Sequence, residues 1–118
     1  MPPLVMVILA VLCIASGQLL FKLTATRIQG VPLASILSDW RTIAIFGTAL
    51  SIYAGATVLW VLALRELSLS YAYMFMSLSF VLVPIAAVAL FGERLTMSFW
   101  IGAALIIGGL IVILGDGR

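Results

Sequence analysis

The sequence contains no histidine and only one cysteine, Cys13, among its 118 residues. A single cysteine cannot form an intrachain disulfide, and a chain without histidine or a cysteine cluster has no conventional zinc or haem site. It also has no glycine-rich phosphate-binding loop of the kind that binds ATP. These absences exclude a disulfide-stapled secreted domain, and we expect no cofactor.

Charge is scarce as well, because only 8% of the residues are charged while 65% are apolar. A soluble domain is about half apolar and about a quarter charged. The composition therefore excludes a soluble globular protein and a disordered chain. It predicts an integral membrane protein, with residues 1–118 forming one domain.

The few charged residues separate long uncharged tracts. A helix needs about 20 apolar residues to cross a bilayer core of roughly 30 Å. The tracts show no alternation of polar and apolar residues, which excludes the strands of a membrane β-barrel. We therefore predict an all-α integral membrane four-helix bundle. The predicted helices lie near 3–22, 41–64, 71–91 and 98–115.

Local signals predict where these helices begin and end. Asp39 is a candidate N-cap for the second helix. Gly92 is a natural stop for the third helix, and Thr96 or Ser98 a start for the fourth. Residues 33–37 are expected to form a short turn of helix at the membrane interface.

The basic residues favour one orientation only weakly. The positive-inside rule places the first and third connections in the cytoplasm. Those connections carry Lys22, Arg27, Arg41 and Arg94, whereas the other side carries Arg65 and Arg118. So small a bias allows insertion in both orientations, and hence an antiparallel dimer.

Small residues recur where helices could approach closely. Gly47, Ser51 and Gly55 are spaced by four in the second predicted helix, and Ala104 and Gly108 share that spacing in the fourth. Such a motif marks close contact but not the chain that supplies it. Because four helices make a thin bundle, we expect a homodimer, which could be antiparallel, or a heterodimer with a similar subunit. The fourth helix is the candidate contact face.

Two polar residues share one face of the first predicted helix, since Gln18 and Lys22 lie four apart. Lys22 is about 28 Å from Pro3 at 1.5 Å per residue, near the predicted helix end. There its ammonium can snorkel to the headgroups, and Gln18 can bond to a neighbouring helix. The functional alternative is an anion site, because a membrane-facing cation suits a phosphate.

The third predicted helix carries Tyr73, Ser77 and Pro84 on one face, with Ser79 beside it. Serines often bond back to their own helix, and Tyr73 and Trp60 can belong to an interfacial aromatic belt. We expect Pro84 to bend the helix because it frees a backbone carbonyl.

The acids all lie at predicted helix ends, at Asp39, Glu66, Glu93 and Asp116. Carriers that exchange protons for cations generally use a carboxylate inside the bilayer. Proton-coupled cation export is therefore disfavoured, and the fixed charge facing the membrane is expected to be positive. Glu93 and Arg94 are expected to cap and anchor the third connection.

Five tracts carry a family resemblance, at 15–22, 59–64, 67–73, 92–95 and 108–115. Together they resemble the drug/metabolite transporter superfamily, within which four-helix chains of this size form the small multidrug resistance family and its relatives. The sequence is most similar to the aminoarabinose–phosphoundecaprenol flippase subunits of that superfamily.

The resemblance implies a transporter and not an enzyme, moving a polyprenyl-phosphate-linked sugar across the bacterial inner membrane. Its expected partners are that lipid-linked sugar and membrane lipid, with no nucleic acid. Lys22 would engage the phosphate, aided by an arginine near the interface. The candidate substrate-binding residues are Lys22, Gln18, Tyr73, Ser77, Ser79, Trp60, Glu93 and Arg94.

Two departures from the family pattern weaken the alternative of a cationic drug exporter. Drug exporters of the family carry a glutamate where this chain has Ile14, and a tryptophan where it has Met76. A third hypothesis is a non-transporting membrane subunit that partners a glycosyltransferase. A functional polar face argues against that hypothesis, and its residues are Gln18, Lys22, Tyr73 and Ser77.

Overall fold

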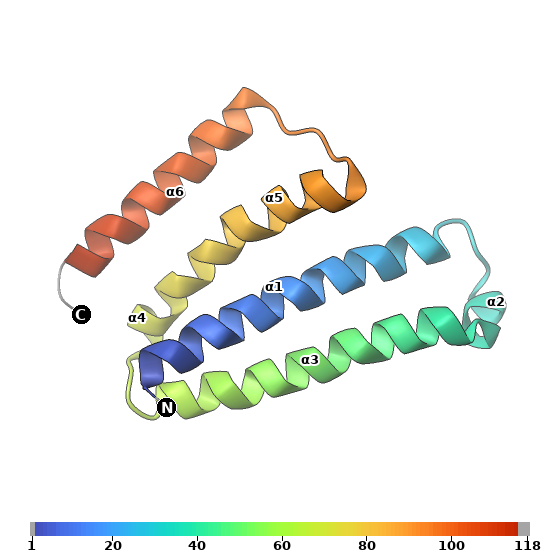
Figure 1. The fold of residues 1–118 in the computed structure, drawn as a ribbon, viewed down its shortest axis with the longest axis horizontal. Helices are drawn as coiled ribbons and strands as arrows, with labels where there is room; N and C mark the ends of the chain where they lie inside the picture. The colour runs from blue at the N-terminus through green and yellow to red at the C-terminus, as the bar shows by residue number, and fades with distance from the viewer. Residues whose placement is uncertain (1, 116–118) are drawn as a thin grey trace.

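The structure is a computed structural model that describes residues 2–115, and over that range it is built from helices joined by short turns (Figure 1). Four stretches, at 3–28, 40–64, 69–91 and 97–115, are long and apolar enough to cross a membrane. The predicted all-α membrane fold is confirmed. Asp116 and Arg118 lie outside the described residues. The helices are α1 (Pro3–Ile28), α2 (Leu33–Ser38), α3 (Trp40–Leu64), α4 (Leu69–Met74), η1 (Phe75–Leu78), α5 (Ser79–Phe91) and α6 (Met97–Gly115).

Helix α1 is longer than the sequence predicted, because it ends at Ile28 and not near Lys22. The prediction treated the charge as a boundary, but no glycine or proline follows until Gly30. The hydroxyls of Thr24 and Thr26 also donate to carbonyls of the preceding turn and fit the helix. Lys22 therefore lies six residues, about 9 Å at 1.5 Å per residue, before the end of α1.

The other end signals are confirmed. Asp39 caps α3 and accepts a hydrogen bond from the backbone amide of Arg41. Gly92 ends α5 with a left-handed φ of 67°, which a residue with a side chain rarely adopts. Thr96 accepts from the amide of Phe99 at the start of α6. The short helix α2 occupies the position expected for an interfacial turn.

The third membrane stretch is irregular before its proline. It begins at Leu69, capped by Ser68, and passes through a 3₁₀ turn at Phe75–Leu78 before α5 starts. Pro84 lies inside α5. The helix thus departs from α geometry six to nine residues before Pro84, about two turns at 3.6 residues per turn, and the bend at Pro84 stays a prediction.

Helices α1 and α3 form an antiparallel hairpin, and α5 lies against α1 on its other side (Figure 1). The hairpin is close because three alanines spaced by seven, Ala49, Ala56 and Ala63, are fully buried or nearly so. The predicted stripe of Gly47 and Gly55 has no neighbour within 4 Å of an added Cβ. That stripe therefore does not pack helices within this chain. Helix α6 packs mainly on η1.

A polar cluster fastens the end of the hairpin where the chain passes from α1 through α2 into α3. Nη2 of Arg27, near the end of α1, lies 3.3 Å from Oδ2 of Asp39. The Thr42 hydroxyl donates to the same Oδ2 at 2.7 Å and accepts from Nε of Arg27 at 3.1 Å. The Thr42 hydroxyl, with the Arg41 amide and the Arg27 guanidinium, holds the pKa of Asp39 below its ordinary value of 3.8.

We expect Asp39→Asn to lower the thermal stability of the purified protein at neutral pH. A carboxyl whose pKa is lowered by folding contributes stability above its unfolded pKa, and this contribution is lost as the pH falls through the folded pKa. The difference in unfolding temperature between the wild type and Asp39→Asn should therefore shrink as the pH falls below about 4. Thermal unfolding in detergent at several pH values measures this. The exposed Glu66, changed to Gln, is the control, and a gap between wild type and Asp39→Asn that persists at low pH would contradict the assignment.

Candidate functional site

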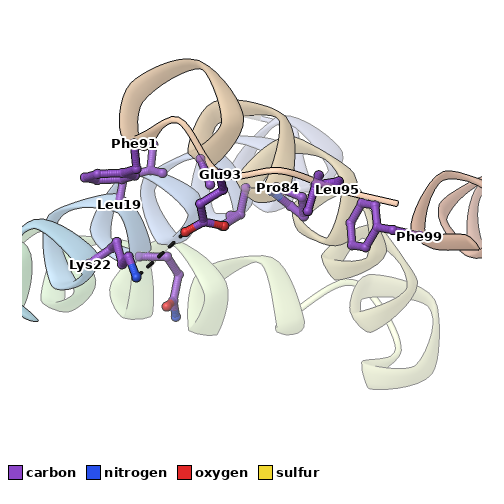
Figure 2. Close-up of a pocket in the computed structure, with 10 residues that line it drawn as sticks. Leu19, Lys22, Pro84, Phe91, Glu93, Leu95 and Phe99 are labelled. Carbon is purple, nitrogen blue, oxygen red and sulfur yellow. Dashed lines mark ion pairs between the residues drawn. The ribbon is translucent and has the colours of Figure 1, made fainter. Parts of the chain in front are cut away.

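A cavity of about 280 Å³ lies between α1, α5 and the loop that follows α5 (Figure 2). Inside it, Nζ of Lys22 is 3.7 Å from Oε2 of Glu93. Gln18 lies one turn before Lys22 on the same wall. Three of the predicted site residues are thus brought together. The remaining lining is apolar and consists of Leu19, Val83, Pro84, Ala87, Phe91, Leu95 and Phe99.

The unequal reach of α1 and α5 creates this pairing. Helix α5 stops at Phe91, and the left-handed Gly92 turns the chain so that Glu93 faces the side of α1. Helix α1 continues past Lys22, so Lys22 lies along its flank and not at its tip. The expectation that Glu93 and Arg94 act together at the third connection is corrected: Glu93 pairs with Lys22, while Arg94 is exposed and does not line the cavity.

The pair also changes the expected electrostatics. The sequence suggested that the fixed charge facing the membrane is positive. In the structure the Lys22 ammonium is matched by the Glu93 carboxylate, so the two side chains together carry no net charge. Glu93 does lie after a helix end, as predicted. The end of α5, however, lies beside the flank of α1.

Tyr53 of α3 is a residue of the site that sequence reasoning missed. The Gln18 side-chain amide donates to the Tyr53 hydroxyl. The ring of Phe21 stacks on Tyr53 with centroids 5.2 Å apart. A Cβ on Gly17 would lie 2.5 Å from Cε2 of Tyr53, so only glycine leaves room for the ring. The one available signal was a glycine directly before a polar residue in an apolar helix.

Tyr53 lines a second cavity, of about 260 Å³. Trp60 and Tyr73 line it, and their rings meet edge to face with centroids 6.4 Å apart. These two predicted site residues therefore come together, but not with Lys22. Ile14 and Met76, where this chain departs from drug exporters, line the same cavity. The cavity consequently contains no carboxylate for a cation.

The two serines on the third stretch are used differently. The Ser77 hydroxyl donates to the carbonyl of Met74 at 2.7 Å, and the Ser79 hydroxyl to that of Met76 at 2.6 Å. Neither serine lines either cavity. Their hydrogen bonds serve the 3₁₀ turn and the start of α5, and the geometry gives them no place beside Lys22.

The chain matches known transporters over nearly its whole length. A model of the EamA-like transporter family matches residues 1–115. A Pseudomonas fluorescens protein named as the probable 4-amino-4-deoxy-L-arabinose-phosphoundecaprenol flippase subunit ArnF is 36% identical over 111 residues, covering 88% of this chain and 81% of that protein.

Shorter matches point to the same group. Proteins named as the probable ArnE subunit of that flippase, from Escherichia coli strains S88 and UTI89, are each 42% identical over 67 residues, or 57% of this chain. The match covers 60% of the length of each of these relatives. No solved structure matches. The chain is a multi-pass membrane protein and belongs to the EamA-like transporter family, within the drug/metabolite transporter superfamily that its sequence predicted.

Proposed function

We propose that this chain is a subunit of a flippase that moves a polyprenyl-phosphate-linked sugar across the bacterial inner membrane. The observation that carries the proposal is the position of Lys22. Its ammonium faces a cavity on the flank of a membrane-spanning helix, in a chain similar to proteins named as flippase subunits for such a lipid. A lysine that only snorkelled would be expected at the helix tip, where the headgroups are.

The proposed route is a groove in which the polyprenyl tail stays in lipid. The phosphate binds Lys22, and the sugar lies beside Gln18. Beyond the Gln18–Tyr53 hydrogen bond, the second cavity offers Trp60 and Tyr73 to the sugar. Each polar group that crosses hydrocarbon unpaired costs several kcal/mol, and these side chains lower that cost. Consumption of the cargo on the far side would give the net direction.

Transport by purified protein in vesicles tests the proposal. The chain is reconstituted with either a second copy or a similar subunit, and a polyprenyl-phosphate sugar is added to one leaflet. We expect the protein to accelerate transfer to the other leaflet by about tenfold or more over protein-free vesicles, while phosphatidylglycerol is not accelerated. Equal acceleration of both lipids, or of neither in a verified dimer, would contradict the proposal. Acceleration of neither would favour the non-transporting subunit.

The thin shape of the chain supports a dimer as the working unit. Its extents are 51 × 37 × 18 Å, so it is too thin to surround a sugar headgroup. Gly108 and Ala104 of α6 border an open hollow of about 410 Å³, and a Cβ added at Gly108 would meet nothing within 4 Å. We therefore keep α6 as the proposed contact face.

We expect Gly108→Leu to weaken dimerisation by about tenfold, because small residues allow membrane helices to approach closely. Ile106→Leu is the matched control, since two residues apart on a helix point to nearly opposite sides. Dimer fractions from cross-linking in native membranes provide the measurement. An unchanged dimer in Gly108→Leu would exclude this face, and a wild type that is only monomeric while active would exclude the dimer.

A further inference from the structure

A hollow of about 390 Å³, lined by Arg65 and Glu66, lies between the start of α1 and the end of α3, which are side by side in Figure 1. Met6 also lines it and is sixteen residues, about 24 Å, before Lys22 along α1. We propose that this hollow binds a bilayer phospholipid whose headgroup carries both a phosphate and a primary ammonium. The lipid stays with the protein, so the inference is independent of the proposed function.

The first support is that the two charges in this hollow are unpaired. At the Lys22 end of the bundle, two ion pairs form within the chain. By contrast, the exposed side chains of Arg65 and Glu66 make no ion pair or hydrogen bond within residues 2–115, either with each other or with another residue. A guanidinium has five donors and a carboxylate has about four acceptor sites, so both have capacity for a ligand.

The second support is that the lining of the hollow changes from charged to apolar along α3. Arg65 directly follows the membrane-spanning stretch 40–64, and a spanning stretch ends about where hydrocarbon meets the headgroups. Leu59 and Leu62 line the hollow from inside that stretch, and Leu59 is about 9 Å along the helix from Arg65. The hollow therefore presents charge at the headgroup level and apolar side chains at the acyl level, which is the polarity of a phospholipid.

The two charges of opposite sign also indicate the class of headgroup. The planar guanidinium of Arg65 matches a phosphate, to which it can donate two parallel hydrogen bonds. A headgroup that is only anionic would place its charge beside the like charge of Glu66. An ethanolamine-type ammonium instead pairs with the Glu66 carboxylate. Because Arg65 and Glu66 are adjacent in the chain, a headgroup whose phosphate and ammonium are joined by a short link can reach both.

Lipid retention by the purified full chain in detergent tests this inference. The protein is offered equal amounts of phosphatidylethanolamine and phosphatidylglycerol with identical acyl chains, and retained lipid is counted by native mass spectrometry. We expect the wild type to retain about threefold to fivefold more phosphatidylethanolamine, the upper range for an ion pair exposed to water. Glu66→Gln should retain both lipids equally, and Arg65→Gln should retain little of either. Arg94→Gln is the matched control and should keep the preference, because Arg94 is exposed and does not line this hollow.

Several results would overturn the inference without affecting the proposed function, because none of them measures transport. They are equal retention of both lipids by the wild type, a preference that survives in Glu66→Gln, and retention of phosphatidylethanolamine at the wild-type level by Arg65→Gln. Loss of the preference in Arg94→Gln would also overturn it, since net charge and not this hollow would then be decisive. If Arg65→Gln does not fold, Arg65→Lys decides because it keeps the charge: a folded Arg65→Lys should still prefer phosphatidylethanolamine, and loss of that preference contradicts the site.

Discussion

Replacement of Lys22 by Ala should reduce transport of a polyprenyl-phosphate-linked sugar by about tenfold to a hundredfold, while the dimer still assembles. The ammonium is the cation that the cavity offers to a phosphate, and a hydrogen bond to a charged group contributes about 1.5–3 kcal/mol. The change also leaves Glu93 without its partner at 3.7 Å, so the remaining carboxylate repels the phosphate.

Lys22→Arg should retain part of the activity, because the charge survives while the compact ammonium becomes a wide planar group. The measurement is transfer between leaflets in vesicles, normalised for the amount of inserted protein. Snorkelling predicts another pattern, in which both variants transport normally because a helix end tolerates either change. Normal transport by Lys22→Ala would therefore remove Lys22 from the mechanism.

Gly17→Ala should be the most disruptive glycine-to-alanine change in the hairpin, because a Cβ at Gly47 or Gly55 would meet nothing within 4 Å. The added Cβ would lie 2.5 Å and 2.6 Å from two ring atoms of Tyr53, so the ring has to move. That movement breaks the hydrogen bond from Gln18 and the stack on Phe21. Overpacking of this kind costs about 1–3 kcal/mol. We expect a lower unfolding temperature in detergent and reduced transport.

A double-mutant cycle isolates the cause. In a Tyr53→Leu background the ring is gone, and Gly17→Ala should then cost much less than in the wild type. Gly55→Ala in α3 is the matched control, because a Cβ there meets nothing within 4 Å. Equal effects of Gly17→Ala with and without the Tyr53 ring would show that the close approach is not what matters.

Local chemistry made much of the fold predictable. The length of the apolar tracts and the scarcity of charged residues predict four membrane-spanning helices, without any knowledge of how these helices pack. Asp39, Gly92 and Thr96 act within a few residues of themselves, so their roles as helix ends follow from residue type. The predicted end of α1 was wrong, because the charge of Lys22 was interpreted as a helix boundary. Lys22 instead lies on the flank of the helix, where it is a candidate functional residue.

The site itself depends on relations between helices. Whether Glu93 meets Lys22 depends on how far α5 extends along α1. The residues near Glu93 and Lys22 in the sequence do not determine this relative position. Tyr53 matters because α3 presents it to Gly17 and Gln18 across the hairpin. Arg27 and Thr42 likewise become partners only when the hairpin closes. Each of these contacts joins segments that pattern reasoning treats separately.

The Lys22–Glu93 pair crosses the boundary between two unequal parts of the molecule. On one side is the hairpin of α1 and α3, packed along its length and fastened by Arg27, Asp39 and Thr42. On the other is the length of chain from α5 into α6, with α6 attached mainly at η1. A ligand that binds Lys22 in place of Glu93 would therefore remove an ion pair that joins these two parts of the molecule.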